Sequence, residues 1–280
     1  MRAMTRAITT SFHATALVLA TVTLVGVGAC DDEGNNDLGG PVDLLGADLP
    51  VVLPDLLSCP QPIFTGFPGD STSERRVDCS LCGCTVDTLS KAAEQGLWTK
   101  STLSATLSDS APGIYIVADG SVGPAFASLT SLNPGGSFYL DGDFDLRMEY
   151  STPVFPSASR IALRVDVPSS EFFEVSRGRT VDGAAVYSAT LAGIPAEKAA
   201  SVNIGTLQIV RHGATITVFG DGTQVAMSTA AGSGRAAIFL SAGLEGCGPT
   251  DAGVPDSGVC TLAATMHDLR LASGVLVDRR

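Results

Sequence analysis

Two stretches near the middle of the chain alternate apolar and polar residues with a period of two. The first spans residues 142–150 and the second spans residues 160–167. Their apolar positions are Phe144, Leu146, Met148, Tyr150, Ile161, Leu163, Val165 and Val167. A strand with this period buries one face and leaves the other in water, as the strands of antiparallel sheets do. The alternation therefore predicts half-buried β-strands over both stretches.

Shorter segments of the same kind fill much of the chain from residue 98 onward. They are 114–117, 125–129, 172–176, 184–191, 206–211, 215–219, 235–242 and 262–271. The chain has 31 Gly and 15 Pro and is only 16% charged, and many short strands between such turn residues predict a β-sandwich or barrel. In the last segment the apolar parity changes between Met266 and Leu269, which predicts a β-bulge near His267-Asp268.

The order of these segments resembles the concanavalin A-like lectin/glucanase superfamily, which includes laminin-G-like domains. The residues that carry the resemblance are Gly142–Tyr150, Gly205–Phe219, Ala236–Ala242 and His267–Gly274. It covers residues 98–277 and implies an all-β fold, an antiparallel jelly-roll β-sandwich. Because it consists of pattern and order, without a chemical signature, it implies a fold more than an activity.

An acidic row follows from the alternation in the first strand. Asp141, Asp143, Asp145, Arg147 and Glu149 share one parity, so a regular strand places them on one face. The candidate residues for binding a ligand such as a sugar are Asp143, Asp145, Arg147, Glu149 and Arg164. Calcium is the one cofactor that this face would suit, through Asp141 and Asp143. The alternative is a solvated strand face that binds nothing.

Catalysis by this row is a third interpretation. Asp143 and Asp145 would lie about 6.6 Å apart at Cα, within the range of about 5–9.5 Å for the carboxyl pairs of glycoside hydrolases. Glucanases of the superfamily carry Glu-x-Asp-x-Glu on a strand, whereas this chain has Asp143, Asp145 and Arg147. Arg147 would keep its neighbours ionised, which opposes the raised pKa of a proton donor. We therefore predict a domain without catalytic residues.

The first 29 residues are predicted to be an export signal. Arg2 and Arg6 precede an apolar run over residues 14–27, which is shorter than the roughly 20 residues of a membrane-spanning helix. Residues 27–30, Val-Gly-Ala-Cys, resemble the lipobox of bacterial lipoproteins, which implies that Cys30 is acylated and anchored in the lipid bilayer. Ordinary cleavage nearby, with Cys30 as a plain thiol, is the alternative. We expect an exported lipoprotein of the cell envelope, in the outer membrane.

Residues 30–97 divide into two segments ahead of the predicted sandwich. Residues 30–58 contain seven acids between Asp31 and Asp55 and no Lys or Arg, which predicts a flexible acidic tether. Residues 59–97 are rich in cysteine and end in the one predicted helix. Asp87 or Thr88 could cap this short helix, and Gly96 could end it.

The seven cysteines include six besides Cys30. An even set in an exported protein predicts disulfides, here among Cys59, Cys79, Cys82, Cys84, Cys247 and Cys260. The sequence does not determine how these six cysteines pair. Cys247–Cys260 is the simplest hypothesis, because this disulfide would close a loop rich in Gly, Pro and Asp. A zinc knuckle over Cys79–Cys84 is the alternative.

The net charge and the aromatic residues of the chain limit the classes of function that it can have. The net charge is −12 at pH 7, which excludes nucleic acid as a partner because such binding needs Lys and Arg to neutralise phosphates. The aromatic residues that could stack on a sugar, or pack in the core, are Trp98, Tyr115, Tyr139, Tyr150 and Tyr187. The leading hypothesis is a non-catalytic, lectin-like domain that binds a glycan or a surface partner. The alternatives are a structural lipoprotein that docks another envelope protein and a glycoside hydrolase of the glucanase type.

Overall fold

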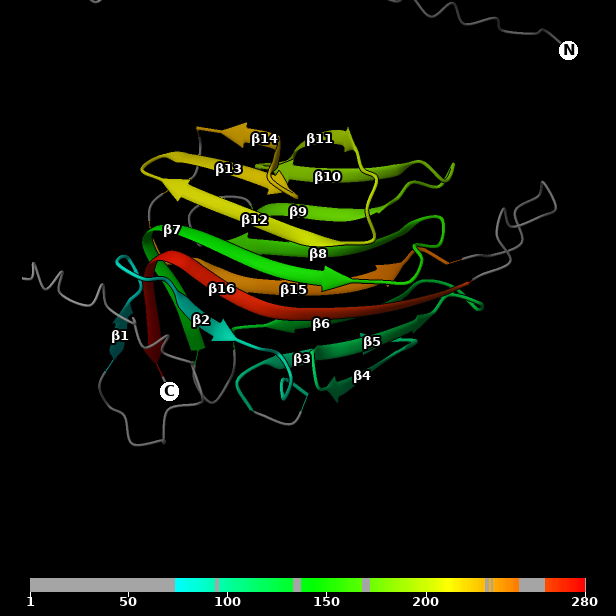
Figure 1. Ribbon diagram of the computed structural model, residues 1–280, viewed down its shortest axis with the longest axis horizontal. Helices are drawn as coiled ribbons and strands as arrows, with labels where there is room; N and C mark the ends of the chain where they lie inside the picture. The colour runs from blue at the N-terminus through cyan, green and yellow to red at the C-terminus, as the bar shows by residue number, and fades with distance from the viewer. Residues whose placement is uncertain are drawn as a thin grey trace, which may run out of the picture. The chain divides into compact units, whose positions relative to one another are not determined.

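Two antiparallel β-sheets make up the part of the chain that the computed structural model describes (Figure 1). The described residues are 74–93, 96–132, 137–167, 172–229, 232, 234–246 and 260–279. They include no helix, and so none with the length and apolar character to span a membrane. The predicted signal and tether, with Cys30, Cys59 and Cys247, lie outside the described residues.

One sheet has nine strands and the other has seven within this described part. The nine-stranded sheet consists of β1 (Arg75–Asp78), β2 (Cys84–Asp87), β4 (Ala105–Ser110), β5 (Gly113–Asp119), β7 (Ser137–Ser151), β12 (Ile204–His212), β13 (Thr215–Gly220), β14 (Thr223–Ser228) and β16 (Thr261–Arg279). The seven-stranded sheet consists of β3 (Thr99–Leu103), β6 (Ala125–Thr130), β8 (Ser159–Asp166), β9 (Phe172–Arg179), β10 (Ala185–Leu191), β11 (Ile194–Ala199) and β15 (Ala237–Leu244). The strand orders are β14-β13-β12-β7-β16-β5-β4, with β1 and β2 also paired to β16, and β11-β10-β9-β8-β15-β6-β3.

The inner faces of the two sheets share one hydrophobic core. Phe144, Leu146 and Met148 of β7 are at most 1% exposed, and Leu163 and Val165 of β8 are fully buried. The intervening residues of both strands face outward, as the alternation predicts. The predicted fold is confirmed as an all-β, antiparallel sandwich of the jelly-roll class.

Strand β16 is the longest strand described and holds the nine-stranded sheet together. It pairs with β7 on one side, and on the other with β5, β2 and β1 in succession. Its register with β7 shifts between His267 and Arg270, and Asp268 has a φ of 47°. This irregularity confirms the predicted bulge. Because β1 and β2 are strands of this sheet, part of the cysteine-rich segment belongs to the sandwich.

The predicted helix is wrong. Cys84–Asp87 is strand β2, and a loop follows it over 88–93, with turns at 90–93. Asp87 accepts a hydrogen bond from the Leu89 N–H at 2.7 Å, and Leu89 has a φ of 60°. The left-handed conformation of Leu89 cannot continue into a right-handed helix. Leu89 and Ala92, which lie within the predicted helix, reach the core from this loop, since both are fully buried.

Disulfide bonds cross-link the cysteine-rich segment. Cys79 and Cys84 are joined, so the expectation of a disulfide here is confirmed. Cys82 and Cys260 are disulfide-bonded as well. The predicted Cys247–Cys260 disulfide is not tested, because Cys247 lies outside the described residues. Oxidised sulfurs carry no thiolate, so a zinc knuckle over Cys79–Cys84 is not formed.

Candidate functional site

The acidic row predicted on β7 has several separate sets of partners. Arg147 donates from Nε and Nη2 to the two Asp145 carboxylate oxygens at 3.0 and 2.7 Å, which raises the pKa of the Arg147 guanidinium. Gln208 Nε2 donates to Asp145 at 2.8 Å. Asp143 instead accepts a hydrogen bond from the Gly213 N–H at 2.8 Å. Its carboxylate also lies 3.0 Å from Nδ1 of His212, at the end of β12.

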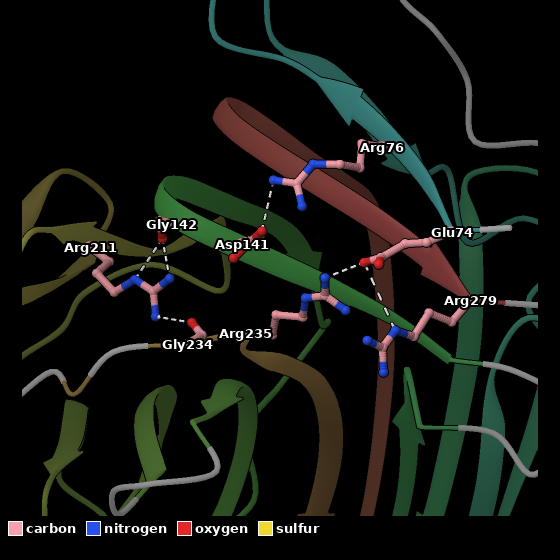
Figure 2. Close-up of polar contacts among 8 residues, drawn as sticks. All are labelled: Glu74, Arg76, Asp141, Gly142, Arg211, Gly234, Arg235 and Arg279. Carbon is pink, nitrogen blue, oxygen red and sulfur yellow. Dashed lines mark hydrogen bonds and ion pairs between the residues drawn. The ribbon is translucent and has the colours of Figure 1, made fainter.

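Asp141 lies at a different place again, beyond a kink of β7. Figure 2 shows Arg76 of β1 reaching Asp141, with Nη2 2.8 Å from Oδ2. Arg211 Nε donates to the Gly142 carbonyl at 2.7 Å, which holds the kink against β12. The two acids considered for calcium, Asp141 and Asp143, therefore each have a protein partner of their own.

Arg164 is not part of this row, because β8 belongs to the other sheet. Its guanidinium carbon lies 4.0 Å from the Phe172 ring centroid and 5.1 Å from that of Phe239. Nε and Nη2 donate to the two Asp166 oxygens at 2.6 and 2.9 Å. The outer faces of a sandwich point in opposite directions, so the structure separates Arg164 from the other predicted ligand-binding residues.

Most of the aromatic candidates point into the core. Trp98, Tyr150 and Tyr187 are 2%, 0% and 4% exposed. Trp98 packs edge-on against Phe138 with ring centroids 5.0 Å apart. Phe126, which the sequence did not single out, is 41% exposed on the outer face of the seven-stranded sheet.

An open groove of about 650 Å³ crosses that outer face. One row of its residues comes from five neighbouring strands: Phe126 (β6), Gly243 (β15), Arg160 (β8), Gly178 (β9) and Val186 (β10). Arg160 thus stands between two positions without side chains, and an exposed aromatic ring lies at one end. The neighbouring strands lie close at both glycines, since an added Cβ would overlap the Ser159 carbonyl oxygen at Gly178 and would be 2.7 Å from Phe126 Cβ at Gly243.

The next row on the same face consists of small and polar side chains. It runs through Ser128, Ser241, Ala162, Ser176, Ser188 and Glu197 in register across β6, β15, β8, β9, β10 and β11. Four of these residues line the groove, namely Ser241, Ser176, Ser188 and Glu197. Short side chains on successive strands make a trough, and their hydroxyls can both donate and accept hydrogen bonds.

The residues of the groove could not be found from one stretch of sequence. Each strand contributes one or two of them, and the pairing register that aligns them is a long-range property. The one local signal was a glycine inside a strand, at Gly178 and Gly243, since such a glycine often marks the close approach of another group.

A smaller cleft, of about 330 Å³, lies on the outer face of the nine-stranded sheet. It contains the predicted residues Arg147 and Glu149, together with Asp268 and Arg270 of β16. Residues 82–84 of the disulfide-bonded loop form part of its lining. The structure therefore places the two predicted residues beside the bulge of β16.

Comparisons with known proteins add little to this geometry. No protein-family model matches the chain, and no curated protein matches it. Among solved structures, a sialidase matches with 14% identity and a TM-score of 0.46 over 71% of this chain and 18% of that one, so the chain spans less than a fifth of its length. A β-glucanase of Bacillus licheniformis matches with 12% identity and a TM-score of 0.41 over 66% of this chain and 92% of that one. A carbohydrate-binding module, CBM66 from Bacillus subtilis, matches with 14% identity and a TM-score of 0.36 over 64% and 97%. Likeness at this level carries no argument about ligand or activity.

Proposed function

We propose that the groove on the seven-stranded sheet binds a glycan chain. The observation that supports this is the row of small polar residues beside Arg160 and Phe126, which has a serine on four of five neighbouring strands, three of these serines lining the groove. A trough with a hydroxyl on almost every strand matches an extended ligand that carries a hydroxyl on almost every ring carbon. The groove volume of about 650 Å³ lies within the range of about 300–1,000 Å³ of small-molecule sites.

Arg160 is well placed to orient such a ligand. Its Nη1 lies 3.6 Å from Glu174 Oε1, and its side chain is 63% exposed, so most of its donors face water. Phe126 offers an apolar face at the end of the same row, and aromatic rings bury large areas against other flat apolar surfaces. A sugar ring on Phe126 would bring its hydroxyls toward Arg160 and the serines.

Binding without hydrolysis is part of the proposal. The carboxylates that line the groove are Glu197 of β11 and Glu245 after β15, among the residues that the structure describes. Four strand spacings separate β11 from β15, or about 19 Å at about 4.8 Å each. Acid and nucleophile or base of a glycoside hydrolase are about 5–9.5 Å apart, so these two cannot act as such a pair.

The test is a titration of the full chain with a panel of soluble polysaccharides by isothermal calorimetry. Arg160→Ala is expected to weaken binding about tenfold or more, because hydrogen bonds to a charged group contribute about 1.5–3 kcal/mol. Arg147→Ala is the matched control, since Arg147 is also an exposed, ion-paired strand arginine but lies on the other sheet. Its affinity is expected to equal that of the unaltered chain.

Other outcomes would reject the proposal in distinct ways. Binding lost in Arg147→Ala and kept in Arg160→Ala would move the ligand to the β7 face. Release of reducing ends from a bound polysaccharide, abolished by Glu197→Gln, would make the protein a glycosidase. No binding to any polysaccharide, with co-purification of one envelope protein, would favour the docking function.

We propose further that acylated Cys30 anchors the protein to the cell envelope, in the outer membrane. The support is the resemblance of residues 27–30 to a lipobox. Cys30→Ser is expected to move the protein from the membrane fraction to the soluble fraction and to abolish labelling with radioactive palmitate. A membrane-bound Cys30→Ser protein would contradict this.

A further inference from the structure

The bulge of β16 places two consecutive side chains on one face of the sheet. In a regular strand His267 and Asp268 would point to opposite faces. Here the flanking residues Met266 and Leu269 are both fully buried, whereas His267 and Asp268 are each partly exposed. The left-handed φ of 47° at Asp268 makes this possible, and bulges of this kind re-aim side chains next to functional sites.

Glu149 of β7 completes a three-membered cluster. It is the direct cross-strand partner of His267. His267 Nδ1 lies 3.6 Å from Glu149 Oε2 and 3.5 Å from Asp268 Oδ2, and the three potential ligand atoms all lie within 4.8 Å of one another. Hydrogen bonds of nitrogen to oxygen are normally 2.7–3.2 Å, so the His267–Asp268 hydrogen bond at 3.5 Å is a long one, and the His267–Glu149 separation of 3.6 Å lies beyond that range.

The separations suit ligands of a common metal ion. Zinc binds histidine nitrogen and carboxylate oxygen at about 2.0–2.2 Å, and two ligands at that distance in a tetrahedron are about 3.4 Å apart. The observed 3.5 and 3.6 Å are close to this value. We propose that Glu149, His267 and Asp268 form a binding site for a divalent transition-metal ion, with zinc as the ion that the donor set fits best.

The donor set argues for this class of ion over others. An imidazole nitrogen suits zinc, copper, iron and nickel, whereas calcium and magnesium prefer oxygen ligands alone. Three protein ligands with a fourth position open is the arrangement of catalytic rather than structural zinc sites. Cys82 and Cys84 line the same cleft but are disulfide-bonded, so they provide no thiolate ligand.

Two arginines define what the open position would accept. Arg147 and Arg270 are direct cross-strand partners in the same cleft. Like charges placed opposite each other are destabilising unless something compensates them, and each has a carboxylate: Asp145 for Arg147, and Asp268 for Arg270 at 3.6 Å. Arg270 lies 3.6 Å from the Asp268 carboxylate and Arg147 lines the same cleft, so an anionic oxygen group is the chemical class expected as the fourth ligand.

The experiment is a zinc titration of the chelator-treated full chain by competition with a fluorescent zinc indicator. We expect one zinc ion per chain at this site, lost in His267→Ala and in Asp268→Asn. Arg270→Ala is expected to bind zinc more tightly, because Asp268 then has no competing cation. The melting temperature of the unaltered chain should rise with zinc concentration, since the folded state binds the ion.

His212→Ala is the matched control. His212 also pairs with an aspartate, Asp143, at 3.0 Å on the same sheet, but it is 91% exposed and is not part of the three-membered cluster. Zinc binding should be unchanged in this variant. Loss of binding in His212→Ala with retention in His267→Ala, no zinc binding by a folded chain, or a calcium response in place of a zinc response would each overturn the proposal. The glycan titration with Arg160→Ala is independent of these results, because the groove lies on the other sheet.

Discussion

Asp87 shows how one buried residue ties the cysteine-rich segment to the sandwich. Its two oxygens accept hydrogen bonds from the Leu89 N–H at 2.7 Å and from Trp98 Nε1 at 2.8 Å. Trp98 in turn packs against Phe138 of β7. A residue that the sequence suggests as a helix cap therefore caps a turn and positions a core aromatic.

Replacing Asp87 should be costly. Asp87→Ala leaves the Leu89 N–H and Trp98 Nε1–H without their acceptor, and each unsatisfied buried donor costs about 1–3 kcal/mol. Urea unfolding followed by tryptophan fluorescence measures the loss. Asp119→Ala is the control, because Asp119 makes a similar bond to the Ser121 N–H at 3.0 Å on the surface. Equal losses in the two variants would show that burial of Asp87 contributes nothing.

The same carboxyl predicts a dependence of stability on pH. Burial raises the pKa of Asp87 above its ordinary value of 3.8. The folded state then holds this proton more tightly than the unfolded state, so its contribution is greatest below the ordinary pKa. That contribution declines as the pH rises through the raised value. In urea unfolding from pH 3 to pH 7, the stability of the unaltered chain relative to Asp87→Asn should fall with rising pH; a rise would contradict the assignment.

At the scale of elements, the paired strands β7 and β16 each contain a glycine with a positive φ, Gly142 in β7 and Gly274 in β16. Gly274 has a φ of 124°, and an added Cβ would lie 2.8 Å from the Asp143 carbonyl oxygen. Gly142 has a φ of 66°, but an added Cβ would meet no atom within 4 Å. The two positions therefore separate backbone strain from steric contact.

Alanine at these positions should give graded losses. Gly142→Ala is expected to cost about 1–2 kcal/mol, the penalty of a left-handed conformation. Gly274→Ala should cost about 1–3 kcal/mol more, because overpacking adds to strain. Thermal unfolding of both variants measures the difference. A Gly274→Ala variant no less stable than Gly142→Ala would mean that β7 and β16 adjust easily.

The strands that the sequence predicted are those with a buried face, and the ones it missed lie mostly at edges. β8 shows period two because every second side chain enters the core. β11 and β14 are exposed or partly exposed on both faces over almost all of their length, so alternation gave no signal there. The groove and the Glu149–His267–Asp268 cluster were missed for another reason, since each requires the register between strands far apart in sequence. The bulge at His267-Asp268 was predictable, because the parity change lies within one segment.

At the scale of the whole molecule, pairing predicts where the structure opens first. β7, β8, β15 and β16 have partners on both sides, whereas β3, β4, β11 and β14 lie at the ends of the strand orders. Amide hydrogen exchange followed by mass spectrometry should be slowest in the first group and fastest in the second. An edge strand protected as well as β7 would indicate that another chain covers it.

Glu74, the residue just before β1, makes two salt bridges to the sandwich. Glu74 binds Arg235 just before β15 and lies 3.9 Å from Arg279 at the end of β16 (Figure 2). The groove is lined at the other end of β15, by residues 241–245, and an eight-residue strand spans about 26 Å. Figure 1 shows β15 pointing away from β1. Glu74 and the residues of β15 that line the groove therefore lie at opposite ends of this strand, so a ligand bound in the groove at residues 241–245 would stand clear of the Glu74–Arg235 ion pair.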